Sequence, residues 1–147
     1  MKSIVHKLTC PCRAQDSAPL PYAQCCQPWH LGLAHGVYAT SPEQLMRSRY
    51  SAYALATHNN PQGHAMLAYL HATWHASSAP GDLELSPMQW IGLQVLQAQA
   101  SGDAGVVEFE AHYKLEGKAH TLHEVSRFTR HDHASPWLYI DGQVSQD

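Results

Sequence analysis

All four cysteines of this 147-residue chain lie in two short groups near its start, Cys10-Pro11-Cys12 and Cys25-Cys26. Disulfides that staple a fold normally join distant segments, whereas clustered thiolates are typical of a closed, four-coordinate zinc site. The segment between the two groups contains Pro19 and Pro21 and shows no helical period, so it needs a metal ion to hold it. The pattern therefore predicts one structural zinc ion, bound by Cys10, Cys12, Cys25 and Cys26.

The spacing of these cysteines leaves alternatives open. Cys25 and Cys26 are adjacent, so both can bind one ion only where the backbone turns sharply between them. His30 follows Cys26 by four residues and is an alternative to one thiolate, because imidazole is also a common zinc ligand. The competing interpretation is that the cysteines are free thiols, or that Cys25 and Cys26 form a redox pair.

Cys10-Pro11-Cys12 followed by Pro21-Tyr22-Ala23-Gln24-Cys25-Cys26 resembles the SEC-C motif, the zinc knuckle found at the tail of the bacterial protein-translocation ATPase. The resemblance implies that all four cysteines ligate zinc. The loop between the two pairs differs from the usual one, because residues 13–24 form a longer segment that lacks glycine and lysine.

Two helices are expected after the knuckle. Ser41 is a suitable N-cap for the first one, and Asn59-Asn60-Pro61 ends it. One face of this helix, at positions i, i+3, i+4 and i+7, is formed by Met46, Arg49, Tyr50 and Tyr53. Arg49 is therefore expected to point inward, and Arg47 to lie to the side. A second helix is expected from Gln62 to about Thr73.

The hydrophobic period changes to two after residue 87. Apolar residues at 107, 109, 111, 113 and 115 alternate with polar ones, which is typical of a strand with one buried face. Ser101-Gly102-Asp103 and Glu116-Gly117-Lys118 predict the turns of antiparallel hairpins. Two further strands are expected at about 119–130 and 137–141. Helices followed by four strands predict an α+β domain with the helices packed on one face of a curved antiparallel sheet.

Four segments of this domain form a second recognisable pattern, at residues 47–53 (RSRYSAY), 73–75 (TWH), 122–128 (LHEVSRF) and 137–142 (WLYIDG). Together they resemble the YchJ-type family, small and largely uncharacterised bacterial proteins that begin with a SEC-C knuckle. The resemblance implies a cystatin-like cone similar to nuclear transport factor two (NTF2), and it brings no known reaction. We expect a SEC-C-like zinc knuckle at residues 1–35 and an NTF2-like domain at residues 36–147.

The inner face of the third strand carries the strongest candidate for chemistry. Strand alternation places four side chains together on it: Leu122, Glu124, Ser126 and Phe128. This face has the larger apolar residues, so it should point into the cone and bury Glu124. A buried carboxylate needs a partner, and we expect Arg49 to supply it at a nitrogen–oxygen distance of about 2.7–3.0 Å. Removing Glu124 should then destabilise the fold by about 3–5 kcal/mol, because the guanidinium loses its partner.

Two interpretations of this pair remain open. In the favoured, structural one it only fixes the helix on the sheet, because buried ion pairs also occur without catalysis. In the functional one Glu124 is a base, and the candidate catalytic residues are Glu124, His75 and Tyr53. The expected pocket then comprises Arg49, Tyr50, Tyr53, Trp74, Glu124 and Trp137. His71 and His75 have the spacing of a two-histidine metal site, but no carboxylate accompanies them, so exposed helix histidines are expected.

Charge and hydropathy argue against nucleic-acid binding and against a membrane-spanning segment. A net charge of −3 without a basic stripe argues against a nucleic-acid surface. The longest apolar run, around residues 90–96, is far shorter than the ~20 residues that span a bilayer. No apolar signal segment precedes the knuckle, so we expect a cytoplasmic protein that does not use the membrane.

Two functions are compatible with these features. The favoured one is a nonenzymatic interaction or adaptor protein, whose Cys-rich knuckle presents a rigid surface to a protein partner. The alternative is a small-molecule-binding protein, or a lyase- or hydrolase-type enzyme, that uses the cone pocket around Glu124. In either case we expect metal loss to loosen residues 1–30 and leave the main domain folded, because that domain is long enough for a core of its own.

Overall fold

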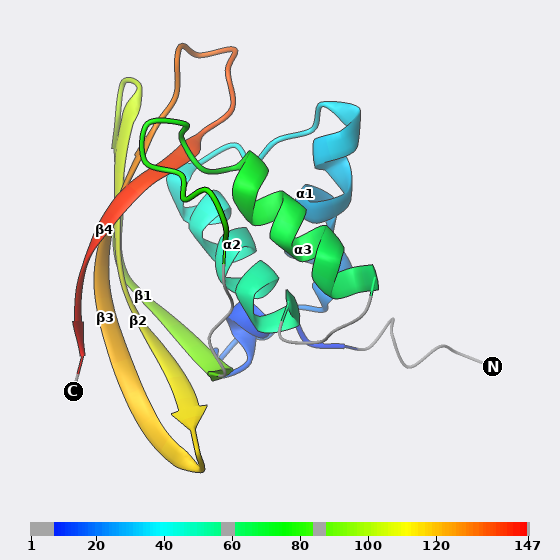
Figure 1. Cartoon of the computed structure of the whole chain (residues 1–147), viewed down its shortest axis with the longest axis vertical. Helices are drawn as coiled ribbons and strands as arrows, with labels where there is room; N and C mark the ends of the chain where they lie inside the picture. Colours follow the sequence, from blue (N-terminus) through cyan, green and yellow to red (C-terminus); the bar gives the residue numbers. More distant parts are fainter. Residues whose placement is uncertain (1–7, 57–60, 84–87, 147) are drawn as a thin grey trace.

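A curved four-stranded sheet and a layer of helices make up the fold, with the helices on the concave side of the sheet (Figure 1). The computed structural model describes residues 8–56, 61–83 and 88–146. The helices are α1 (Gln27–Gly32), α2 (Pro42–Ala56) and α3 (Pro61–Ala72), and the strands are β1 (Gln89–Ser101), β2 (Ala104–Leu115), β3 (Lys118–Thr129) and β4 (Leu138–Gln146). All strand pairs are antiparallel and follow chain order, so the expected α+β fold with a cystatin-like cone is confirmed.

The start of α2 follows the expected capping pattern. Ser41 Oγ accepts a hydrogen bond from the backbone N–H of Gln44 at 3.1 Å, which satisfies one of the free donors of the first turn. Gln44 Oε1 in turn accepts from the backbone N–H and the hydroxyl of Thr40, at 2.9 and 2.7 Å. The neighbouring α3 ends at Thr73, whose hydroxyl donates to the Tyr69 carbonyl at 2.8 Å. These ends fix α2, which packs on the sheet, and α3, which packs against α2.

The predicted hairpins are confirmed. Leu115 pairs with Lys118 across the two-residue loop Glu116-Gly117, whose φ angles are 53° and 83°. Two left-handed residues in a row match the twist of the strands they join. A second tight loop at residues 102–103 connects β1 to β2. Irregular register steps at two points in β1 increase the bend of the sheet, so that it closes around the helices.

Strand β4 is longer than the predicted segment 137–141, because it continues through Gly142 to Gln146. Gly142 pairs with Ser126 of β3. A Cβ at this position would lie 2.6 Å from Cδ of Glu124, closer than real contacts allow. The glycine therefore does not end the strand but leaves room for the Glu124 side chain within it.

One hydrophobic core joins the sheet, α2 and the cysteine segment. Apolar side chains alternate inward along β2 as expected, and Val107 is fully buried. Cys10, Cys12 and Cys26 belong to the same core as Leu45 of α2. The division of the chain at residue 35 stays a prediction, since both parts share this core. No helix in the described ranges is long and apolar enough to cross a membrane.

Candidate functional site

Two short antiparallel segments, residues 8–10 and 20–22, form the two arms that bring the cysteines together. The backbone N–H of Cys10 donates to the Leu20 carbonyl at 2.8 Å, and that of Tyr22 donates to the Leu8 carbonyl at 2.7 Å. Cys12 lies in the 3-10 turn Pro11–Arg13, and Cys25 follows the turn Tyr22–Gln24. The backbone angles of Cys25, φ −121° and ψ −90°, are outside the regular regions and produce the sharp turn that lets adjacent cysteines face one point.

The four sulfurs form a compact cluster. The Sγ atoms of Cys10, Cys12, Cys25 and Cys26 all lie within 4.8 Å of one another. Cys12 Sγ is 3.7 Å from Cys10 Sγ, 3.5 Å from Cys25 Sγ and 3.7 Å from Cys26 Sγ. A disulfide would need about 2.05 Å. A tetrahedral ion with metal–sulfur bonds of about 2.3 Å places its ligands about 3.8 Å apart, so the cluster has the dimensions of a four-coordinate metal site.

The surroundings of the cluster also suit thiolates. Ser51 Oγ of α2 donates to Cys26 Sγ at 3.2 Å and lies 3.4 Å from Cys10 Sγ. Nη1 of Arg47, also on α2, lies 3.8 Å from Cys12 Sγ and 3.3 Å from the Cys12 carbonyl oxygen. This arginine places a positive charge beside the sulfurs, which stabilises negative charge on them.

The thiols share their protons unevenly. Hydrogen bonds with Cys10, Cys12 and Cys26 stabilise the thiolate of Cys25 and hold its pKa far below the ordinary value. Hydrogen bonds with the same neighbours, and then burial, raise the pKa of Cys26. Four sulfurs this close cannot all be thiolates without a cation between them, because like charges at this distance repel strongly. The residues present therefore fit a bound metal cation.

His30 does not belong to the cluster. Its Nε2 lies 2.7 Å from the Ser48 carbonyl, which can only accept, so Nε2 carries the proton. Its Nδ1 then accepts from the Tyr22 hydroxyl at 2.6 Å. Burial lowers the pKa of this imidazole, and the neutral ring links the second cysteine arm to α2. The alternative in which His30 replaces a cysteine is therefore not supported.

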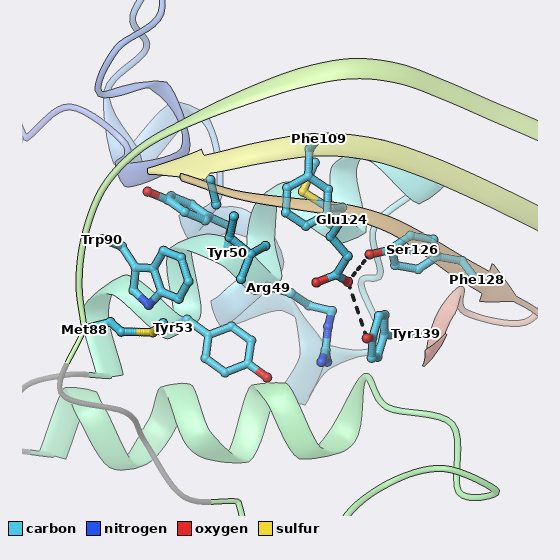
Figure 2. Close-up of a pocket in the computed structure, with 13 residues that line it drawn as sticks. Arg49, Tyr50, Tyr53, Met88, Trp90, Phe109, Glu124, Ser126, Phe128 and Tyr139 are labelled. Atoms are coloured by element: carbon cyan, nitrogen blue, oxygen red, sulfur yellow. Dashed lines mark hydrogen bonds between the residues drawn. The ribbon is translucent and has the colours of Figure 1, made fainter. Parts of the chain in front are cut away.

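A cavity of about 230 Å³ lies between α2 and the concave face of the sheet (Figure 2). Six of the thirteen lining residues are aromatic: Tyr50, Tyr53, Trp90, Phe109, Phe128 and Tyr139. The remaining apolar wall is formed by Met46, Met88, Ala111 and Leu122. Besides the tyrosine hydroxyls, the polar lining comes from Arg49 of α2 and from Glu124 and Ser126 of β3.

Glu124 extends from β3 into this cavity (Figure 2). Its Oε2 accepts hydrogen bonds from the hydroxyls of Ser126 and Tyr139, the latter at 3.4 Å. Its Oε1 makes no hydrogen bond within the described part of the chain, and it is not sealed from solvent. Burial raises the pKa of Glu124, although both hydroxyls and the charge of Arg49 act to lower it. The cavity thus offers one carboxyl oxygen to a bound molecule.

The expected ion pair between Arg49 and Glu124 is wrong. No nitrogen–oxygen contact within 4.0 Å joins these two described side chains. Nη1 of Arg49 instead donates to the Leu70 carbonyl at 2.8 Å and to Thr73 Oγ1 at 2.7 Å. Its guanidinium also lies over the rings of Trp74 and Tyr139, at 4.8 and 4.6 Å from their centroids. The C-terminal end of α3 and the two rings take the place of the expected carboxylate.

Two of the predicted pocket residues, Trp74 and Trp137, and one catalytic candidate, His75, lie outside the cavity. Trp74 forms part of the support of Arg49 rather than the lining. His75 is not in the cavity lining, and its Nδ1 accepts a hydrogen bond from the backbone N–H of Ser77 at 3.1 Å. Trp137, which directly precedes β4 and is buried in the core, lines a separate hollow of about 200 Å³. Of the catalytic candidates, Glu124 and Tyr53 line the cavity and His75 does not.

Sequence comparisons agree with this architecture. A family model described as "YchJ, middle NTF2-like domain" matches residues 41–142. A UPF0225 protein of Ralstonia nicotianae is 45% identical, over 92% of this chain and 91% of its own length. A UPF0225 protein of Cupriavidus metallidurans is 42% identical, over 92% and 90%.

The chain belongs to the YchJ family. Two solved structures show that the likeness includes the knuckle. A SEC-C motif containing protein from Psychrobacter arcticus has a TM-score of 0.76 and 28% identity, covering 99% of this chain and 87% of that protein. The SEC-C motif containing protein RPA3114 from Rhodopseudomonas palustris has a TM-score of 0.72 and 29% identity, covering 92% and 98%.

In this YchJ family member, several residues at the two sites are not among the sequence candidates. Arg47 and Ser51 are four residues apart and so share a helix face, which is the signal that could have marked them as neighbours of one site. Tyr139 lies two residues beyond Trp137, so strand alternation could have marked it as well. Gly142 gives no such signal, because its role is to leave space.

Proposed function

We propose that this protein is a cytoplasmic zinc protein whose cone binds a small molecule. The four-sulfur cluster supports zinc, because Zn²⁺ prefers tetrahedral thiolate sites of these dimensions. The unpaired cysteines support a reducing compartment, in which thiolates stay available for metal. Four protein ligands leave no open position, so zinc would hold the two arms on α2 and take no part in chemistry.

The free oxygen of Glu124 in an aromatic cavity is the observation that supports ligand binding. Concave, mostly apolar sites with a few placed polar groups are where proteins bind small molecules. Oε1 has no hydrogen-bond partner among the described residues and is not sealed from solvent, so a bound molecule can replace water as its donor. No reaction is assigned to the cavity, since a cone of this kind hosts many functions.

The zinc assignment is tested by elemental analysis of protein purified without chelator. We expect one zinc per chain, and less than half of that in Cys12→Ser, because three thiolates bind the ion far more weakly. Protein without zinc, or with a stoichiometric amount of another metal, would contradict the assignment.

Ligand binding is tested by a fragment screen using ligand-observed NMR. The cavity is filled in Leu122→Trp, whereas Val106→Trp adds the same ring on the outer face of β2, where Val106 is 42% exposed. We expect fragments that bind wild type and Val106→Trp but not Leu122→Trp. Equal binding by all three proteins, or no binding by any, would contradict a ligand site in the cone.

Protein recognition by the knuckle is a second candidate. Leu8 and Leu20 lie on its two paired arms and are 45% and 37% exposed. Exposed apolar side chains of this kind are common at interfaces. Leu20→Glu should abolish capture of a specific partner while the zinc content stays unchanged. Capture that is insensitive to this substitution would argue against the knuckle surface.

A further inference from the structure

We propose that the cone cavity selects a small neutral hydroxyl compound, a phenol or alcohol, which donates a hydrogen bond to Oε1 of Glu124. This inference rests on the proposed ligand-binding function and adds the chemical class of the ligand. Three features carry it: the charges at the polar end of the cavity, the way Glu124 is held, and the nature of the wall.

The polar end of the cavity presents a cation and a carboxyl group together. Arg49 and Glu124 both line it without forming a direct pair. An ammonium ligand paired with Glu124 would lie in the same cavity as the guanidinium of Arg49, and a carboxylate ligand paired with Arg49 would share it with Glu124, so each would gain one attraction and one repulsion. A neutral hydroxyl avoids both repulsions. It also donates to a carboxylate and accepts from a cation, so it matches both groups.

Glu124 is held so that one oxygen stays available. Ser126, whose side chain is buried, and Tyr139 both bond to Oε2, which leaves Oε1 without a partner in the described part of the chain. The strand opposite carries Gly142, where any Cβ would collide with the carboxyl group. A carboxyl group fixed on one oxygen is a directed acceptor, and a donor placed on its other oxygen forms a charge-assisted hydrogen bond.

The wall favours a compact, apolar body. Six aromatic rings surround a space of about 230 Å³, which is below the roughly 300–1,000 Å³ of sites for drug-sized ligands. Aromatic walls bind flat or compact apolar groups by stacking and edge contacts. A single ring or short branched chain bearing one hydroxyl therefore fits the cavity.

Four probes of similar shape separate the possibilities: p-cresol, toluene, benzylamine and benzoate. Each is titrated into ¹⁵N-labelled protein at about pH 8, where carboxyl groups are ordinarily ionised. We expect p-cresol to bind about tenfold more tightly than toluene, which corresponds to one hydrogen bond to a charged acceptor. We expect benzylamine and benzoate to bind more weakly than p-cresol.

Two variants assign the selectivity to Glu124. In Glu124→Leu, p-cresol and toluene should bind equally, because the acceptor is gone. The control is Glu110→Gln on the outer side of β2, which should retain the wild-type preference. The ranking of the four probes on wild type needs no variant, so the proposal remains testable if Glu124→Leu does not fold.

Several outcomes would overturn the proposal. Toluene binding as tightly as p-cresol, the tightest binding by benzylamine or benzoate, or a p-cresol preference that survives in Glu124→Leu would each exclude the hydroxyl class. If none of the four probes binds while screened fragments do, the class is wrong but the cavity is still a ligand site. If neither probes nor fragments bind, the proposed ligand-binding function fails as well.

Discussion

Tyr139 lies between the two charged side chains of the cavity and contacts both. The centroid of its ring is 4.6 Å from Arg49 Cζ, and its hydroxyl donates to Oε2 of Glu124 at 3.4 Å. The two charged groups therefore share Tyr139 as a partner instead of contacting each other. Arg49 acts on Glu124 only at longer range, where its effect on the pKa of Glu124 is smaller than that of burial.

This arrangement changes the expected effect of removing Glu124. Because the guanidinium keeps its bonds to Leu70 and Thr73, Glu124→Ala should destabilise the protein by about 1–2 kcal/mol rather than 3–5. Arg49→Ala should cost more than about 3 kcal/mol, since it removes those bonds and two ring contacts. Urea unfolding of both variants measures the difference. Equal costs would show that the two charges act as one pair.

Glu124 should also make stability fall as the pH rises. Burial raises its pKa in the folded state above the ordinary 4.5, so the folded protein holds this proton more tightly than the unfolded chain. The resulting stabilisation is fully present below the unfolded pKa and is lost as the pH rises through the folded pKa. Glu124→Gln does not titrate, so wild type should lose stability relative to this variant from about pH 4.5 upward. Urea unfolding at a series of pH values tests the sign, and a relative gain by wild type would contradict it.

The sequence correctly predicted the direction of a side chain where that direction depends on a single helix or strand. Period two in β3 placed Glu124 toward the cone, and helical spacing placed Arg49 toward the same space. The partner of Arg49 depends on the distance between the end of α3 and α2. The spacing of residues within one helix does not contain that distance. Arg47 shows the same limit, since its contact with Cys12 joins segments that are 35 residues apart.

At the scale of elements, β4 shapes the cavity because Gly142 has no side chain where the strand passes Glu124. It passes the Glu124 carboxyl at Gly142, and this close approach lets both strands stay paired to Gln146. The same glycine is the reason why the predicted strand ended at residue 141, because glycine after an apolar run ordinarily indicates a turn. The helix start at Ser41 and the hairpin at Glu116-Gly117 were predictable, since each is decided by residues close in sequence.

Gly142→Ala should therefore act through Glu124. The new methyl group would displace the carboxyl from Ser126 and Tyr139, at an expected cost of about 1–2 kcal/mol. In a Glu124→Ala background the same substitution should cost little, so a double-mutant cycle isolates the contact. Gly81→Ala is the matched control, because no atom lies within 4 Å of a Cβ added at this exposed position. Full additivity of the two substitutions would disprove the mechanism.

At the scale of the whole molecule, α2 contacts both the knuckle and the cone cavity. One face of this helix contacts the sulfur cluster through Arg47 and Ser51, and the other lines the cavity through Arg49, Tyr50 and Tyr53. The cysteines also belong to the core that the sheet completes. The sequence predicted that residues 1–30 would loosen alone, because the main domain is long enough for a core of its own, but length does not determine which segments share that core.

Metal removal should consequently destabilise the whole protein rather than residues 1–30 alone. Free zinc at about 1,000 times its Kd adds about 4 kcal/mol to the folded state. For a chain of this size that corresponds to a fall in Tm of roughly 8–16 °C on chelation. We expect one calorimetric transition that moves to lower temperature with chelator and returns when zinc is restored, because α2 unfolds together with the arms it holds. If chelation instead produced a separate low-temperature transition and left the main one in place, the knuckle would be an independent appendage, and the shared core would contribute little to its stability.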